Sequence, residues 1–220
     1  KLSDLVNNRV EIYLVDKGNK ILSKSKSFNR EKAIDAIAER NIKIYLEHYI
    51  ESINENTIEL STVETERNNS LKINYSGLLW TGGLSPCRLQ FIDHLLDENK
   101  KIKVNKFLQI KEYQNIFFVG DIVFCEDDPF PSSAQVAMQQ GFLTAQNIIS
   151  LRKGNKLKSF QFEDLGEMLS LGIGNASITG YGVTLAGSLA FKIRHFAYLM
   201  RMPGFSLSLK SAGSRLLSKK

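Results

Sequence analysis

Two stretches of the sequence have the same pattern, in which an apolar run ends at a turn and residues at helical spacing follow. Residues 10–15 (VEIYLV) stop at Asp16 and precede apolar positions at helical spacing between residues 33 and 39. Residues 116–119 (IFFV), the most apolar run in the chain, stop at Gly120 and Asp121, and a helix is predicted from about residue 134 to residue 151. Strands that lead through loops into helices are typical of nucleotide-binding α/β folds. We therefore predict an α/β fold.

Further elements are predicted between and after these two runs. Residues 42–46 are interpreted as the next strand, residues 57–60 and 71–75 as a hairpin, and residues 78–80 as a brief strand that leads into Thr81 and Gly82. Asn29 is expected to cap the first helix. We also expect a short helix at residues 91–96 and a strand at residues 107–109. The glycine pairs at positions 172/174 and 180/182 neither follow a strand nor open a helix at the required offset, so we interpret them as turn or packing glycines.

The net charge of +6 is concentrated at one end of the sequence. Residues 184–220 contain seven Lys or Arg and no Asp or Glu, so the rest of the chain is close to neutral. This segregation implies an anionic partner for the tail, either phospholipid headgroups or nucleic acid. Because no nucleic-acid recognition motif and no aromatic array for base stacking accompanies the charge, we expect no nucleic-acid partner.

The same tail has an amphipathic pattern over residues 185–202. Its basic side chains fall largely away from a set of apolar residues at helical spacing, namely Leu185, Leu189, Ile193, Phe196 and Met200. Such a helix can lie in a membrane interface, where each basic residue near anionic headgroups contributes roughly 1 kcal/mol. A helix that packs in a homodimer is the alternative, and the two are compatible. No run approaches the ~20 apolar residues that a membrane span needs.

The two cysteines, Cys87 and Cys125, are far apart and form no CxxC pattern. This spacing predicts structural thiols in a reducing compartment rather than a disulfide framework or a zinc site. The isolated His195 does not indicate a metal ligand either, so no metal site is expected.

Asp16 closes a predicted strand, where an acidic residue can bind the ribose hydroxyls of an adenine nucleotide. It would also repel a 2′-phosphate and favour NADH, although the neighbouring Lys17 leaves NADPH open. Taken alone, an Asp at a strand end is more often a turn former. The chain has no initiator Met, and the glycine-rich turn expected about 20 residues before such an Asp is absent, so we interpret the chain as the continuation of a longer protein.

The turn at Gly120 and Asp121 has a different chemistry. A glycine at the end of a strand lets the backbone approach a ligand closely, and the following carboxylate can accept hydrogen bonds from ribityl hydroxyls. The helix predicted a dozen residues later would direct its N-terminal N–H groups at an anionic or carbonyl group. A turn-forming Asp is the alternative for any isolated Gly-Asp pair.

Three motifs occur here in a recognisable order: LLWTGGLSP (residues 78–86), IFFVGD (residues 116–121) and PSSAQVAMQQG (residues 131–141). Together they resemble the closing half of the two-dinucleotide-domain FAD flavoproteins, and specifically the type II NAD(P)H:quinone dehydrogenases. The resemblance continues through LGEMLSLGIGNA and the GVTLAGSLAFKIRHFAYLMRMPG region, which looks like the C-terminal membrane-attachment module of that family. The stretch VDKGNKILSKSKSFNREKAI is similar to its cyanobacterial and plastid branch.

The resemblance implies a role for each motif. Asp121 would bind the ribityl or pyrophosphate region of FAD beside Gly120, and Ala134 and Gln135 would contact the flavin ring through their backbone. On the quinone side of the ring, the resemblance implies Gln135, Met138 and Gln139, with Gln135 and Gln139 as the catalytic residues. In the rest of the site, it implies Thr81 and Gly82 near the nicotinamide–flavin junction and Asp16 at the ribose of NAD(P)H.

The implied activity is hydride transfer from NAD(P)H to FAD and onward to a membrane quinone, without proton pumping. The expected location is peripheral, at the cytoplasmic face of a membrane or, in the cyanobacterial and plastid branch, at a thylakoid or stromal face. The alternatives are a soluble FAD/NAD(P)H reductase of the same superfamily and a non-catalytic membrane-surface adaptor derived from a truncated flavoprotein. A solvated helix face remains the alternative for the glutamines of residues 135–140.

These motifs predict three segments. Residues 1–83 would be the remainder of the NAD(P)H-binding domain without its glycine-rich motif, and residues 84–151 the C-terminal part of the FAD-binding domain. Residues 152–220 would form the membrane-surface module.

Overall fold

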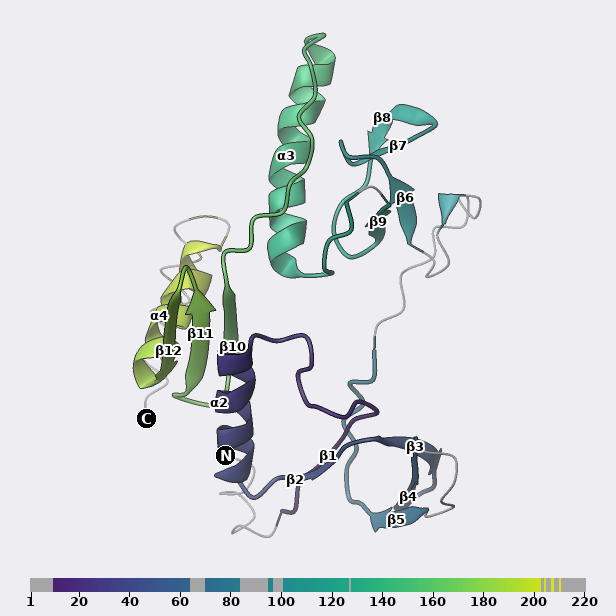
Figure 1. Ribbon diagram of the computed structural model, residues 1–220, viewed down its shortest axis with the longest axis vertical. Coiled ribbons are helices and arrows are strands. Elements are labelled where there is room, and N and C mark those ends of the chain that lie inside the picture. The colour runs from purple at the N-terminus through teal and green to yellow at the C-terminus, as the bar shows by residue number, and fades with distance from the viewer. Residues whose placement is uncertain are drawn as a thin grey trace. The chain divides into compact units, whose positions relative to one another are not determined.

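The structure, a computed structural model, describes residues 10–63, 70–83, 95–96, 101–126 and 128–202, together with residues 204, 207 and 210. It divides into two compact units (Figure 1). Unit 1 comprises residues Lys1–Leu79 and Gly166–Lys220, and unit 2 comprises residues Trp80–Leu165. The predicted short helix at residues 91–96 and Cys87 lie almost wholly outside the described residues.

Unit 1 begins with the predicted strand, helix and strand. Strands β1 (Tyr13–Val15) and β2 (Lys43–Tyr45) pair in parallel, and helix α2 (Ser27–Ala38) connects them. A parallel pair requires such a crossover, because the chain must return to the same end of the sheet. The α/β prediction and these three elements are confirmed, with strands shorter than the apolar runs indicated.

An antiparallel meander follows in unit 1. It consists of β3 (His48–Ile53), β4 (Thr57–Thr62) and β5 (Leu71–Asn74), so the predicted hairpin of β4 and β5 is confirmed and β3 was missed. The brief strand predicted at residues 78–80 was wrong. Leu79 is 86% exposed and Trp80 62% exposed, so this apolar stretch belongs to a loop rather than to a sheet.

The glycine-rich region forms a second antiparallel sheet that the sequence did not predict. Its strands are β10 (Glu167–Ser170), β11 (Ala176–Gly180) and β12 (Val183–Gly187). Gly172, Gly174 and Gly182 have positive φ in the two turns between these strands, which confirms them as turn glycines. Helix α4 (Ser188–Met200) follows directly, so the amphipathic helix begins after Leu185, which belongs to β12.

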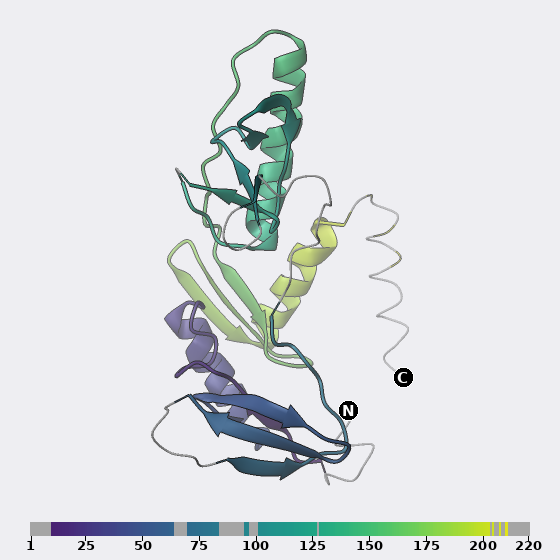
Figure 2. The same cartoon turned by 90° about the vertical axis from the view of Figure 1, so that its right-hand side faces the viewer.

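Helices α2 and α4 cover the two faces of this sheet (Figure 2). Successive strand residues point to opposite faces, and the neighbouring residues Ala176 and Ser177 of β11 are both 0% exposed. Both faces of the strand are therefore covered. Within unit 1 the C-terminal sheet thus packs on the helix of the first strand–helix–strand segment.

Asn29 joins α2 to the sheet and does not cap its own helix. Its Nδ2 donates to Glu167 Oε2 at 2.8 Å, and its Oδ1 accepts from Thr179 Oγ1 at 3.0 Å. The N-cap residue is Lys26, whose backbone N–H donates to the same Glu167 carboxylate at 3.0 Å. The predicted capping by Asn29 was wrong because the helix begins at Ser27, so Asn29 lies in its first turn, where it is buried against the sheet.

Unit 2 contains two small strand pairs and one long helix. Strands β6 (Ile102–Val104) and β9 (Val123–Cys125) pair in parallel, and β7 (Gln109–Ile110) and β8 (Tyr113–Phe117) pair antiparallel. Helix α3 spans Ala134–Arg152, within one residue of the prediction. The predicted strands at 107–109 and 116–119 are each displaced by about two residues, and β6 and β9 were missed. Cys125 is 2% exposed in the apolar core of this unit, which agrees with a structural thiol.

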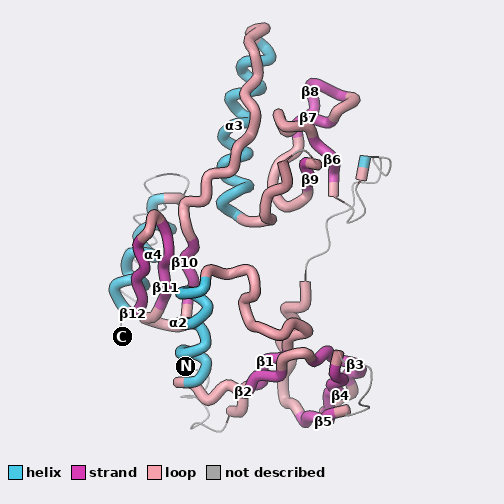
Figure 3. Tube along the Cα trace, in the orientation of Figure 1, coloured by secondary structure: helices cyan, strands magenta, loops and turns pink. Residues whose placement is uncertain are grey.

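The chain after α3 returns along the helix without regular structure, which Figure 3 shows as a loop beside α3. Amide side chains of the helix hold it. Asn147 accepts from the Lys158 N–H and donates to the Lys158 carbonyl, both at 2.9 Å. Two residues after Lys158, Phe160 is 6% exposed and packs edge-on against Phe130. Residues up to 165 are therefore part of unit 2.

Candidate functional site

The turn at Gly120 and Asp121 lies three residues beyond the end of β8. Gly120 has a φ of +85°, a conformation that L side chains rarely adopt, so glycine is required here for its backbone rather than for space. A Cβ at this position would lie 3.7 Å from Ala137 Cβ, which is an ordinary contact. The Asp121 side chain is exposed and makes no hydrogen bond or ion pair within the described residues.

Helix α3 supports this turn through its third glutamine. The Gly120 N–H donates to Gln140 Oε1 at 2.7 Å, and Gln140 is 0% exposed. The predicted proximity of the Gly-Asp turn and the glutamine-bearing helix is therefore present in the structure. Gln140 is not among the residues predicted for the site. On a helical wheel, Gln140 lies four residues after the core residue Val136 and therefore on the buried face of α3.

The N-terminus of α3 is capped by its own sequence. Ser133 adopts an extended conformation, and its side chain accepts from the Val136 N–H at 3.2 Å. The Ala134 N–H has no acceptor within the described residues. A helix N-terminus carries a partial positive charge, so an exposed N–H at Ala134 can donate to a carbonyl or anionic group.

The two glutamines predicted as catalytic contact the chain that follows the helix. Gln139 donates from Nε2 to the Glu163 carbonyl at 2.8 Å, and its Oε1 accepts from the Glu163 N–H at 3.0 Å. Gln135 Oε1 accepts from the Leu165 N–H at 3.0 Å. Both ends of the Gln139 amide therefore bond to the Glu163 backbone, whereas Met138 next to it is 53% exposed.

Asp16 stands at the carboxyl end of β1, the edge at which open parallel sheets bind nucleotides. Its Oδ1 accepts from the Gly18 N–H at 2.7 Å, and its carbonyl accepts from the His48 N–H at 3.2 Å. One carboxylate oxygen of Asp16 therefore stabilises the turn, as the turn-forming alternative predicts. The other oxygen makes no hydrogen bond within the described residues.

Thr81 and Gly82 follow directly after the boundary between the two units, which falls between Leu79 and Trp80. Both are exposed, and a Cβ at Gly82 would lie 3.0 Å from the Trp80 ring. The Gly83 N–H donates to the Thr81 carbonyl at 2.9 Å. The structure thus places these residues in a tight turn of unit 2.

Helix α4 exposes the apolar positions that the sequence set apart. They lie on one stripe and are 42–70% exposed, namely Leu189, Ile193, Phe196 and Met200. Among the basic residues, Lys192 is exposed, whereas the Arg194 guanidinium lies 4.6 Å from the centre of the Tyr198 ring. We call Leu189, Ile193, Phe196 and Met200 the α4 stripe. No helix of the described residues has both the length and the apolar character to cross a membrane.

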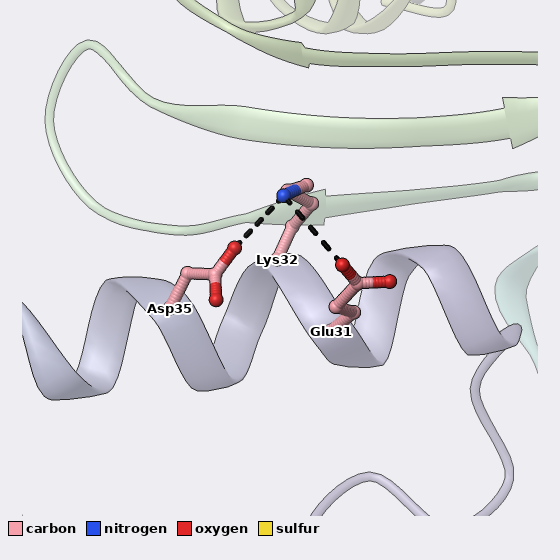
Figure 4. A network of polar contacts seen from close by, with 3 residues as sticks. All are labelled: Glu31, Lys32 and Asp35. Atoms are coloured by element: carbon pink, nitrogen blue, oxygen red, sulfur yellow. Dashed lines mark hydrogen bonds and ion pairs between the residues drawn. The ribbon is translucent and has the colours of Figure 1, made fainter.

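One cluster of charged side chains lies on helix α2. Lys32 on α2 contacts Asp35 at 2.8 Å and Glu31 at 3.9 Å on an exposed surface (Figure 4). The hydrogen bond to Asp35 raises the pKa of Lys32. Within the described part of the chain, no three His, Cys, Asp or Glu residues gather as a metal site would require.

Comparison with known proteins agrees with this arrangement. The sequence model of the pyridine nucleotide-disulphide oxidoreductases matches residues 3–141, which include both β1 and the Gly120 turn. The chain belongs to this family. It is a family of oxidoreductases, and its α/β nucleotide-binding fold is the one that the sequence predicted.

Two relatives within this family are quinone reductases by name. Demethylphylloquinone reductase NdbB of Synechocystis sp. is 31% identical over 209 residues, covering 92% of this chain and 50% of that protein. The chloroplastic/mitochondrial alternative NAD(P)H-ubiquinone oxidoreductase C1 of Arabidopsis thaliana is 27% identical over 222 residues, covering 92% of this chain and 43% of that protein. The predicted resemblance to type II NAD(P)H:quinone dehydrogenases is confirmed. The chain spans about half the length of the curated relatives it matches.

A solved structure has the same fold. NDH2 from Plasmodium falciparum in complex with NADH superposes with a TM-score of 0.79 at 14% identity, over 92% of this chain and 56% of that one. At this level of identity the likeness concerns the fold of the family alone.

Proposed function

We propose that this chain supplies the pyridine-nucleotide turn and one wall of the flavin site of a type II NAD(P)H:quinone oxidoreductase that does not pump protons. The observation that carries the proposal is the Gly120 turn, which is held against α3 by a buried glutamine and presents an exposed carboxylate. A flavin bound there would accept a hydride from NAD(P)H and deliver electrons to a quinone.

The residues at this turn fit a flavin. Gly120 admits a close approach of backbone to ligand, and Asp121 offers carboxylate oxygens to ribityl hydroxyls. The Ala134 N–H at the start of α3 is a donor that has no acceptor among the described residues. Gln135 would contribute its backbone next to Ala134. We propose that Gln139 reaches the acceptor only where its pairing with Glu163 opens.

In unit 1, Asp16 would hold the ribose of NAD(P)H through the carboxylate oxygen that the turn leaves open. Its charge favours NADH by repulsion of a 2′-phosphate, and Lys17 offsets part of that repulsion. Thr81 and Gly82 would line the approach of the nicotinamide to the flavin.

The α4 stripe supports attachment to a membrane surface. Four exposed apolar side chains on one helix face, with Lys192 exposed beside them, match a helix that lies in the interface of an anionic membrane. A lipid-soluble quinone reaches the flavin most directly from such a surface, which favours this function over a soluble reductase. Packing of α4 in a homodimer, the cytoplasmic or stromal side of the membrane and the lack of a nucleic-acid partner stay predictions.

The proposal is tested on the complete encoded polypeptide. We expect it to purify with bound FAD and to reduce a soluble quinone analogue at the expense of NADH. Bound flavin with no quinone reduction would favour the soluble reductase, and absence of flavin would favour the non-catalytic adaptor.

Membrane attachment is tested separately by sedimentation with vesicles of anionic and neutral phospholipid. We expect Phe196→Glu to abolish binding to anionic vesicles because it places a charge on the α4 stripe. Ile34→Glu on α2 is the matched control, since Ile34 is 46% exposed and lies outside the stripe. Equal binding of both variants would contradict an interfacial role of α4.

A further inference from the structure

Helix α3 buries two amide side chains at 0% exposure, Gln140 and Asn147, and the structure uses them differently. Asn147 accepts from the Lys158 N–H and donates to the Lys158 carbonyl, so both ends of its amide are satisfied. Gln140 accepts from the Gly120 N–H at 2.7 Å, while its buried Nε2 has no partner in the part of the chain that the structure describes. Asn147 therefore serves the fold, and only part of the hydrogen-bonding capacity of Gln140 does.

The orientation of the Gln140 amide follows from chemistry. The Gly120 N–H is a donor, so the atom 2.7 Å away must be the amide oxygen and not the nitrogen. This is also the only hydrogen bond of the Gly120 N–H within the described residues. A flexible glycine with a φ of +85° is thus fixed from behind by one side chain of the helix.

The hydrogen bond between Gly120 and Gln140 lies next to Asp121, the residue proposed to bind the flavin. Gly120 precedes Asp121, and the Gly120 carbonyl in turn accepts from the Val123 N–H at 3.2 Å. The bond to Gln140 therefore sets the direction in which the chain leaves the turn, and with it the direction of the Asp121 carboxylate. Without an acceptor on the helix, the glycine would sample other conformations because it has no side chain to restrict it.

We propose that Gln140 is a positioning residue for flavin binding, which acts by holding the Gly120 N–H and so orients Asp121. The inference rests on the proposed function, because the ligand of the turn is the flavin. Gln140 itself need not touch the flavin, and the Gln135 and Gln139 roles are independent of it.

The experiment uses the complete polypeptide with Gln140→Met, Gln140→Glu and Asn147→Leu. Met has nearly the same shape and offers only a weak thioether acceptor, whereas Glu keeps an oxygen for the Gly120 N–H. We expect Gln140→Met to weaken FAD binding about tenfold, because the hydrogen bond that orders the turn is lost. The FAD affinity of Gln140→Glu should stay within about threefold of the parent. Asn147→Leu should lower the melting temperature without changing the FAD dissociation constant.

A second readout needs no flavin. Hydrogen–deuterium exchange of peptides that span residues 116–123 reports the Gly120 amide directly. We expect that amide to be protected in the parent and in Asn147→Leu, and to exchange rapidly in Gln140→Met. If Gln140→Met does not fold, the FAD affinity of Gln140→Glu becomes the test. A large loss of affinity in Gln140→Glu would contradict the role of the acceptor oxygen.

The proposed function and the positioning role of Gln140 are refuted by different results. A parent polypeptide without flavin refutes the proposed function, and the exchange measurement still tests the bond. A parent that binds flavin, combined with parental affinity and parental exchange in Gln140→Met, overturns the positioning role alone.

Discussion

The turns at Asp16 in unit 1 and at Asp121 in unit 2 both follow an apolar run, and they are stabilised in different ways. Asp16 stabilises its own turn, since one of its carboxylate oxygens accepts from the Gly18 N–H at 2.7 Å. Asp121 makes no such contact within the described residues, and its turn is held by Gln140 from another element. A turn that is stabilised from behind leaves its whole carboxylate for a ligand, whereas a self-stabilised turn offers one oxygen.

This contrast predicts that flavin affinity depends on a residue outside the turn, Gln140, as well as on Asp121 itself. Affinity for NAD(P)H should depend mainly on the charge of Asp16. The variants below test that division, in order of decreasing expected effect.

Among the Gly120, Asp16 and Lys32 variants, Gly120→Ala should have the largest effect. A left-handed conformation costs a non-glycine residue about 1–2 kcal/mol, so we expect the FAD dissociation constant to rise roughly tenfold in a titration of the apo polypeptide. Gly154→Ala is the matched control, because Gly154 has a φ of +70° and an added Cβ there would meet nothing within 4 Å. Equal losses of FAD affinity in both variants would show that the effect is general strain and not the site.

Asp16→Asn should have a smaller effect, confined to the pyridine nucleotide. Asparagine keeps an oxygen for the Gly18 N–H, so the turn is preserved and only the charge is lost. We expect NADH affinity to fall about threefold to fivefold, with a relative gain for NADPH because repulsion of the 2′-phosphate is removed. Steady-state KM values for both nucleotides measure this. Glu55→Gln, at another exposed carboxylate of unit 1, should change neither; a drop in FAD content of Asp16→Asn would break the division between the turns.

Lys32→Met should have the smallest effect and none on either nucleotide. The ion pairs of Lys32 are exposed, so we expect the melting temperature to change by no more than about 1 °C near neutral pH. Because Asp35 raises the pKa of Lys32, any stabilisation is fully present below the ordinary lysine value of 10.5 and is lost as the pH rises through the raised pKa. Melting curves of both proteins should therefore converge above that pKa, and a difference that grows there would contradict the assignment.

Local sequence signals predicted those elements whose cause is local. The strand, helix and strand that begin with β1, the β4–β5 hairpin, helix α3 and the turn glycines each follow from spacing or from backbone chemistry that neighbours in sequence determine. Strands β6 and β9 were missed because they are three residues long and depend on pairing with each other across about 20 residues. The sheet of β10 to β12 was missed because its small residues carry no strong strand signal.

The contact between the Gly120 turn and α3 could be predicted from the sequence, but the side chain that makes it could not. The sequence brought the Gly120 turn and α3 together through the family resemblance, but Gln139 and Gln140 are neighbours and point to different sides of the helix. Only the packed structure shows that Gln139 meets the Glu163 backbone while Gln140 meets Gly120. Asn29 illustrates the same limit, since its partners Glu167 and Thr179 are about 140–150 residues away.

The proposed flavin site is the Gly120 turn with α3 behind it, and Asp121 would bind the flavin there. Its most direct test is the FAD dissociation constant of the complete polypeptide with Asp121→Asn, beside the exposed carboxylate variant Asp128→Asn as control. We expect at least tenfold weaker FAD binding in Asp121→Asn, with NADH affinity unchanged, and parental values in Asp128→Asn. Parental FAD affinity and undiminished electron delivery to quinone in Asp121→Asn would contradict it.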